Sequence, residues 1–158
     1  MAYQKLQVGL GVNVIPSDTI NIPNVAGPTQ SGTTTSAVTK SLVDSTVSGK
    51  VNAFTNNLVG YIVYNTSDNT IATVTSFIDD KTLGLSADIM ATGEGYTLYA
   101  DDNPGCVLYV GGAGNLRVLT SSGSDITFTG VLAGSFIPVQ VKRVFVTSNT
   151  AASILALW

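Results

Sequence analysis

Two apolar runs flank a glycine-rich segment in Val107-Leu108-Tyr109-Val110-Gly111-Gly112-Ala113-Gly114-Asn115-Leu116-Arg117-Val118. In both runs apolar side chains recur with the two-residue period of a strand, and the β-branched and aromatic residues fit a pleated surface. The glycines between the runs predict a hairpin turn with positive φ angles. A dinucleotide-binding loop would need a helix after the glycines, whereas strand-like alternation resumes at Leu116. This segment therefore predicts two strands joined by a tight turn.

The same strand pattern recurs through the rest of the chain, and turn residues interrupt it at short intervals. The expected strands cover residues 6–10, 61–64, 71–75, 83–85, 96–99, 107–110, 116–118, 126–128 and 139–146. Residues 36–47 are the one stretch where a helical turn or two is expected, and their Thr, Val and Ser content opposes a longer helix. Short strands at this spacing predict an all-β fold of the sandwich or barrel type.

Two segments rich in Gly, Pro, Ser and Asp, residues 27–36 and 101–105, separate the strand-like regions. They bracket a portion of the chain about the size of a small barrel, and exposed loop tips tolerate such insertions. We therefore expect two small β-sandwich or barrel modules, the second inserted into the first. Residues 1–26 and 104–158 form the host module, and residues 27–103 form a linker plus the inserted module.

The chain has 158 residues, of which only 11% are charged. Soluble domains usually contain about 25% charged residues, so this surface is poor in the charges that keep identical copies apart. We therefore expect a homo-oligomer. The net charge is −3 and no basic run is present, which argues against nucleic acid as a partner. The sequence lacks the features of a signal peptide or of a membrane span, so neither secretion nor contact with a membrane is expected.

The sequence contains no histidine, which removes the commonest general base and the usual metal ligand. We therefore expect no enzymatic activity, no cofactor and no metal site. Most acidic residues lie in turns, where the side chain accepts hydrogen bonds from its own turn. These residues are Asp18, Asp68, Asp79, Asp80, Asp101, Asp102 and Asp125. Asp101-Asp102-Asn103 offers oxygen ligands of the kind that Ca²⁺ prefers, but it lacks the spacing of a calcium-binding loop.

Cys106 is the single cysteine and lies in an apolar run, so we expect a buried core residue rather than a reactive thiol. Asn65-Thr66-Ser67 matches a glycosylation sequon, which we interpret as a turn. Neither motif points to chemistry.

Two interpretations stay open for the basic residues Arg117, Lys142 and Arg143, which lie within or beside expected strands. They occupy either a solvated sheet face or a subunit interface, where Arg is enriched. Two interpretations also stay open for Trp158, because an apolar strand precedes it. Its indole either packs in the core or anchors in a neighbouring subunit.

Parts of the chain outside residues 27–103 resemble a known family. The stretches that carry the resemblance are Val14–Thr19, Cys106–Val118, Asp125–Phe128, Gly134–Val141 and Arg143–Trp158. They resemble the head spike base proteins of gene-transfer-agent-like particles and related tailed phages, including that family's closing apolar strand that ends in Leu-Trp. Within residues 27–103, Val59–Thr70 and Thr82–Ile89 resemble a small β-barrel unit of many phage structural proteins, including those of cyanophages.

The resemblance implies a viral structural protein on the exterior of a bacteriophage capsid, made in the host cytoplasm. Such a virion protein acts as a capsid decoration (cement) protein or as a head spike base, with the major capsid protein and a spike fibre protein as partners. We expect identical copies to assemble as a homotrimer or homopentamer. Phe145, Leu157 and Trp158, on the closing strands, are the residues expected to make the subunit contacts.

A second class of function stays open, namely a receptor- or glycan-binding module of a phage particle. Aromatic side chains that share one face would contact the sugar; the candidates are Tyr61, Tyr64, Tyr96 and Tyr99. A third class, a degenerate enzyme, would require an unexpected metal beside Asp101 and Asp102.

Overall fold

The computed structural model describes residues 8–158, except for the side chain of Pro28. In that part of the chain the regular elements are twelve β-strands and one short 3-10 turn, η1 (Asn56–Leu58), so the fold is all-β as predicted. The helical turns expected at residues 36–47 are absent there; a bridge between Val38 and Ser41 and strand β3 (Ser41–Val43) take their place. No helix among the described residues is long and apolar enough to cross a membrane.

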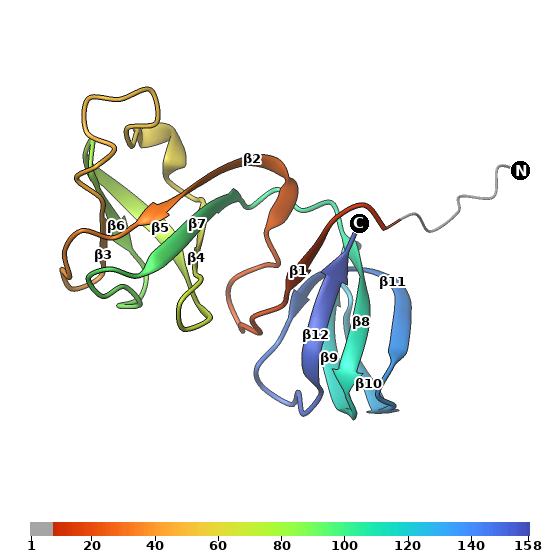
Figure 1. Cartoon of the computed structure of the whole chain (residues 1–158). Helices are drawn as coiled ribbons and strands as arrows, with labels where there is room; N and C mark the ends of the chain where they lie inside the picture. Colours follow the sequence, from red (N-terminus) through yellow and green to blue (C-terminus); the bar gives the residue numbers. More distant parts are fainter. Residues whose placement is uncertain (1–7) are drawn as a thin grey trace, which may run out of the picture. The chain divides into compact units, whose positions relative to one another are not determined.

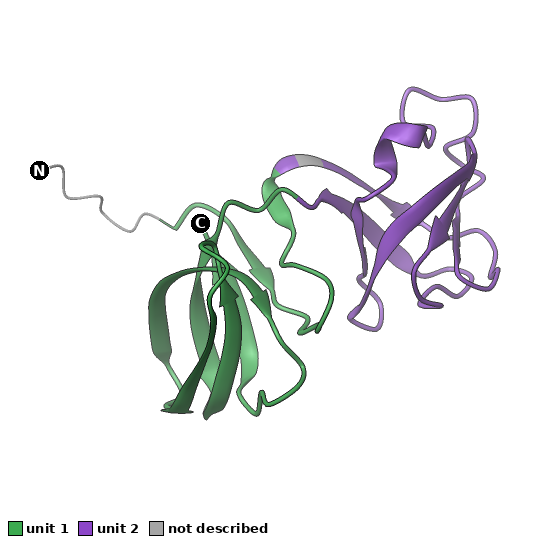
Figure 2. Cartoon of the chain, turned by 180° about the vertical axis from the view of Figure 1, so that it is seen from behind, with its two compact units in different colours: residues 1–26, 102–158 green, residues 27–101 purple. Residues whose placement is uncertain are grey.

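Two compact units make up the chain (Figure 2). Unit 1 consists of residues 1–26 and 102–158, and unit 2 consists of residues 27–101. Each unit has a hydrophobic core of its own, which contains Leu108 in unit 1 and Leu83 in unit 2. That unit 2 is a module inserted into a host module stays a prediction.

Unit 1 is an antiparallel sheet with the strand order β1-β12-β8-β11-β9-β10 (Figure 1). Its strands are β1 (Gly11–Asn13), β8 (Cys106–Gly112), β9 (Gly114–Thr120), β10 (Asp125–Val131), β11 (Ser135–Val144) and β12 (Ala152–Leu157). Strand β11 changes partners along its length: residues 135–137 pair with β8, Val141 pairs with both β8 and β9, and residues 143–144 pair with β9. Leu108 of β8 and Leu116 of β9 share one core although β11 lies between their strands. The sheet therefore folds over into two layers.

The hairpin predicted at Gly111–Asn115 is wrong, because β8 and β9 do not pair with each other. The chain passes at Ala113 from one layer of the sandwich to the other, and neither Gly112 nor Gly114 has a positive φ. The glycines are needed for close packing instead. A Cβ atom on Gly114 would lie 2.5 Å from the backbone nitrogen of Ala151, closer than real Cβ contacts allow.

Unit 2 holds the second sheet, with the order β2-β7-β4-β5-β6-β3. Besides β3, its strands are β2 (Asn24–Thr33), β4 (Ile62–Asn65), β5 (Thr70–Asp79), β6 (Thr82–Leu85) and β7 (Gly95–Ala100). Strand β2 begins within unit 1, because residues 24–26 belong to that unit. The N–H of Thr35, just after edge strand β2, donates to the carbonyl of Val43 on the other edge strand, β3. This bond draws the two edges of the sheet together.

Strand β2 was not predicted, because the composition of residues 27–36 is that of a linker. The strand runs through Gly27 and Pro28 to Thr33. Because β2 lies at an edge of its sheet, a proline there removes no hydrogen bond from a central ladder. Gly27 and Pro28 therefore belong to an edge strand and not to a linker.

Candidate functional site

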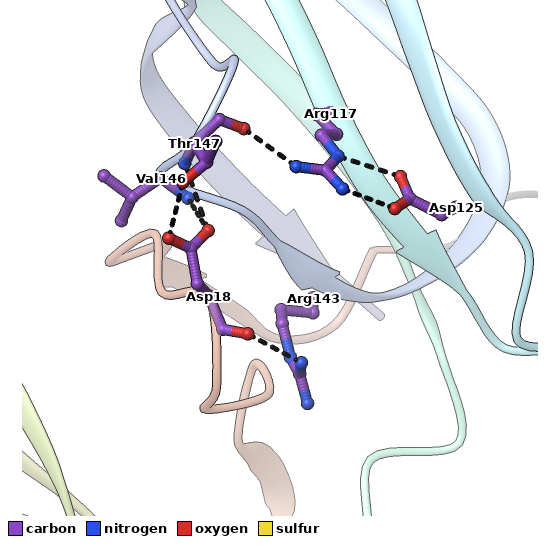
Figure 3. Close-up of polar contacts among 6 residues, drawn as sticks. All are labelled: Asp18, Arg117, Asp125, Arg143, Val146 and Thr147. Atoms are coloured by element: carbon purple, nitrogen blue, oxygen red, sulfur yellow. Dashed lines mark hydrogen bonds and ion pairs between the residues drawn. The ribbon is translucent and has the colours of Figure 1, made fainter.

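A cluster of polar contacts in unit 1 joins parts of the chain that are far apart in sequence (Figure 3). We call it the Asp18 cluster; its members are Asp18, Arg117, Asp125, Arg143, Val146 and Thr147. Asp18 Oδ1 accepts the backbone N–H groups of Val146 and Thr147, both at 3.0 Å, and Oδ2 accepts the Thr147 hydroxyl at 2.7 Å. One carboxylate therefore fixes the segment before β2 to the loop that follows β11.

Two arginines extend the Asp18 cluster over the outer surface of the sandwich. Arg117 donates to both carboxylate oxygens of Asp125, at 3.0 and 2.6 Å, and this pairing joins β9 to β10. Arg143 donates to the backbone oxygen of Asp18 and to Asn21. The guanidinium carbon of Arg117 lies 4.5 Å from the centroid of the Phe145 ring, and that of Arg143 lies 5.8 Å from it. Both arginines thus have partners within their own chain.

The hydrogen bonds of the cluster change the acidity of its carboxyl groups. The bonds from Thr147 are the main cause that lowers the pKa of Asp18 below its ordinary value of 3.8. The hydrogen bond from Arg117 lowers the pKa of Asp125 in the same way. Both groups are therefore held as carboxylates, which suits hydrogen-bond acceptors and not proton donors.

The three residues expected to make subunit contacts lie in different surroundings. Phe145 lies beside Arg117 and Arg143 in the Asp18 cluster. The half-buried side chain of Trp158 packs against the core of unit 1, and its indole N–H donates to Asn103. Leu157 lies opposite Val107 of β8 and Gly11 of β1. The structure does not bring the three together on one surface, and their part in subunit contacts stays a prediction.

A shallow, open hollow in unit 2 has a volume of about 270 Å³. Its lining residues are Asp68, Thr70, Asp88, Ile89, Met90, Ala91 and Glu94. Each of its three carboxylates accepts a hydrogen bond from the chain: Glu94 from Asn65, Asp88 from the backbone of Lys40, and Asp68 from Thr70. Among the described residues no three Cys, Asp or Glu side chains are grouped so that they could hold a metal ion.

A buried acid in unit 2 was not predicted, because it lies in the stretch where helical turns were expected. Asp44 is 1% exposed, and its Oδ2 accepts the Tyr96 hydroxyl at 2.8 Å. Its Oδ1 accepts the N–H and the hydroxyl of Thr46. Burial is the main cause that raises the pKa of Tyr96 above its ordinary value, so the phenol stays protonated and keeps this bond.

The aromatic face proposed for glycan binding does not form as expected. Tyr96 is only 1% exposed and packs edge to face against Phe54 in the core of unit 2. Tyr64 and Tyr99 contact each other edge to face. Tyr61 packs against the same core as Tyr96. A sugar would find no common surface of these four rings, because at least Tyr96 is enclosed.

Turn chemistry accounts for several of the acids as predicted. Asp79 accepts the N–H of Lys81 two residues later, and Asp68 accepts the hydroxyl of Thr70. Asp80 differs, because its carboxylate accepts bonds from Ser48 and Gly49 on a distant loop. Asp18 and Asp125 also bond outside their own turns, and Asp102 accepts a hydrogen bond from the side chain of Asn24. For these four the prediction is wrong.

Two smaller predictions are confirmed. Asn65 is buried and its Oδ1 accepts the N–H of Ser67, so the sequon is a turn. Cys106 is 1% exposed, and burial raises the pKa of its thiol to about 12. The thiol is therefore protonated at neutral pH and enclosed.

Comparison with models of known protein families, with curated proteins and with solved structures finds no match.

Proposed function

We propose that the chain is a structural protein of a phage-like particle, located on the outer surface of the capsid as a decoration protein or as the base of a head spike. It works by assembly of identical copies and by contact with the major capsid protein, and it catalyses no reaction.

The observation that carries this proposal is the use of acidic side chains as structural acceptors. Asp18 and Asp125 hold the outer surface of unit 1 together, and Asp44 and Asp80 hold loops of unit 2. A catalytic acid or base needs a position from which it reaches a substrate proton. Carboxylates that already accept hydrogen bonds from their own chain favour a structural protein over an enzyme.

The scarcity of charge supports assembly. Strands β1, β8 and β12 contain no Asp, Glu, Lys or Arg. Burial of a charged surface in an interface carries a large desolvation penalty, which strands of this composition avoid. The assignment to a particle rests on the resemblance of residues 106–118 and 143–158 to head spike base proteins.

The direct test is co-sedimentation of the purified full chain with empty heads of the particle to which it is proposed to belong. We expect the chain to pellet with the heads and to saturate at a fixed number of copies per head. An unrelated acidic protein of similar size serves as the control. A chain that stays in the supernatant at micromolar concentrations, as the control does, would overturn the proposal. Glycan-array binding in that case would favour the receptor-binding alternative.

A further inference from the structure

Strand β10 is an edge strand of the sheet in unit 1. Within residues 8–158 it pairs with β9 on one side, and no strand of this chain pairs with its other side. The opposite edge strand of the same sheet, β1, has three residues, whereas β10 has seven. An unpaired edge presents main-chain N–H and C=O groups that can bond to the main chain of another strand. Strand β10 is therefore the long open edge of unit 1.

The hydrogen bonds of β9 show which main-chain groups of β10 face the open side. The carbonyl of Arg117, on β9, accepts the N–H of Phe145 at the end of β11, at 3.0 Å. The N–H and C=O of one strand residue point to the same side of the strand, so those of Arg117 point toward β11. Thr127 lies opposite Arg117 on β10. Its N–H and C=O therefore point away from β9, toward the open edge.

The same alternation applies to the neighbours of Thr127. The N–H of Gly130 donates to the side chain of Asn115 on β9, so Gly130 faces β9. Residues at even separations from Thr127 face the open side as Thr127 does. These residues are Asp125 and Thr129, and both are exposed. Three residues thus present their main-chain donors and acceptors along the open edge.

The composition of β10 does not block this edge. Natural edge strands often carry Lys or Pro, which prevent pairing with another chain. Strand β10 contains neither, and its one charged side chain, Asp125, is paired with Arg117. The register of β10 becomes irregular between Phe128 and Val131. Residues 125–129 are therefore the regular stretch that a further strand can extend.

We propose that β10 pairs with β10 of a second copy as an antiparallel strand, with Thr127 of one copy opposite Thr127 of the other. In this register the outward main-chain groups of residues 125, 127 and 129 meet one another across the two-fold axis. Asp125 lies opposite Thr129 of the second copy, so the two acids do not face each other. Ile126, which is 38% exposed, lies opposite Phe128 of the second copy, and such β-branched and aromatic pairs stabilise sheets. The edge is complementary to itself.

This contact is small and specific rather than strong. Five residues span only about 17 Å, and a stable interface covers about 800 Å² on each partner. We therefore expect a weak pair, which forms where copies are held at high local concentration. A two-fold pair cannot close a ring of three or five copies. The inference therefore goes beyond the proposed function, because this pair joins copies that belong to neighbouring assemblies.

Disulfide trapping tests the register with two full-length variants, Thr127→Cys and Thr129→Cys. Directly opposite residues of such a pair have Cα atoms about 5.5 Å apart, which suits a disulfide. The two copies of residue 129 are displaced by about 14 Å along the strands, which does not. The native thiol of Cys106 is buried in both variants. At high protein concentration under mild oxidation, Thr127→Cys should form the covalent dimer at least about tenfold faster than Thr129→Cys.

Amide hydrogen exchange of the wild type gives a second readout of the same pair. The N–H of Thr127 should exchange more slowly at high than at low protein concentration, because a second copy accepts its hydrogen bond. The N–H of Ile126 faces β9 and should be protected equally at both concentrations, so it is the internal control. Exchange at Thr127 that does not depend on concentration would overturn the proposal. Equal trapping rates of the two cysteine variants, or no trapping of a folded Thr127→Cys protein, would also overturn it.

The outcomes for this pair and for the proposed function are separable. A chain that pellets with empty heads, without preferential trapping at position 127, would keep the proposed function and overturn the β10 pair. Preferential trapping at position 127 in a chain that ignores empty heads would support the pair and overturn the proposed function.

Discussion

The carboxylate of Asp18 accepts the backbone N–H of Thr147 at 3.0 Å, across 129 positions of the chain. Unit 1 is assembled from two chain segments that unit 2 separates in sequence. The Asp18 cluster is one of the places where these two segments are joined by side chains. The contribution of the Asp18 cluster to stability, and the pH dependence of that contribution, can therefore be measured as properties of unit 1.

Replacement of Asp18 should destabilise unit 1. Asp18→Ala removes three hydrogen bonds and should lower the melting temperature by about 3–6 °C. The control is Asp79→Ala, because the Asp79 carboxylate bonds within its own turn. The fall in melting temperature of this variant should be smaller. The measurement is thermal unfolding followed by circular dichroism. Equal losses in the two variants would contradict a special role for the long-range bonds.

Acid should weaken the fold through the same groups. The pKa values of Asp18 and Asp125 are lowered in the folded chain, so their charged forms favour folding. This contribution is present above the ordinary value of 3.8 and is lost as the pH falls through the lower folded values. Urea unfolding from neutral pH to about pH 2 should show falling stability below about pH 4. Asp18→Asn should flatten that dependence, and an unchanged pH profile in the variant would count against the assignment.

Removal of the Tyr96 hydroxyl should expose the cost of the buried Asp44 carboxylate. Tyr96→Phe leaves Oδ2 of Asp44 without its phenol donor in the core of unit 2 and should cost about 1–3 kcal/mol of unfolding free energy. Tyr99→Phe, at a half-buried position, is the matched control and should change little. Urea denaturation measures both. A Tyr96→Phe protein as stable as wild type would mean that Asp44 finds another donor.

The layer crossing at Ala113 should tolerate no side chain on Gly114. Gly114→Ala places a Cβ 2.5 Å from the backbone nitrogen of Ala151 and should cost about 1–3 kcal/mol. A Cβ on Gly9 would meet nothing within 4 Å, so Gly9→Ala is the control and should be near neutral. Comparison of urea midpoints gives the answer. If the two variants are equally stable, the crossing is looser than described.

The all-β class followed from the sequence because two-residue periodicity is a local signal. Strands such as Val107–Val110 and Tyr96–Tyr99 could be located from their own side chains. Partner choice is not local, which is why the pairing of β8 with β9 was wrongly expected. Glycines at positions 112 and 114 are compatible both with a hairpin and with a crossing between layers. Only the close approach of Ala151 distinguishes the two structures.

The polar clusters could not be predicted from the sequence for a related reason. An aspartate in a turn usually bonds to its own turn, and Asp79 does so. Asp18 and Asp44 use partners 129 and 52 positions away, and no spacing rule connects such residues. Strand pairing was likewise not visible in the sequence: Leu157 was singled out, whereas Phe136 and Leu155 became neighbours of Tyr109 through strand register.

The most direct measurement is the mass of the full-length chain in solution by light scattering over a range of micromolar concentrations. One copy has a mass of 16.3 kDa. We predict a single assembled species of three or five copies that persists on dilution. A mass of 16.3 kDa at every concentration would contradict the proposal that the chain acts by joining identical copies.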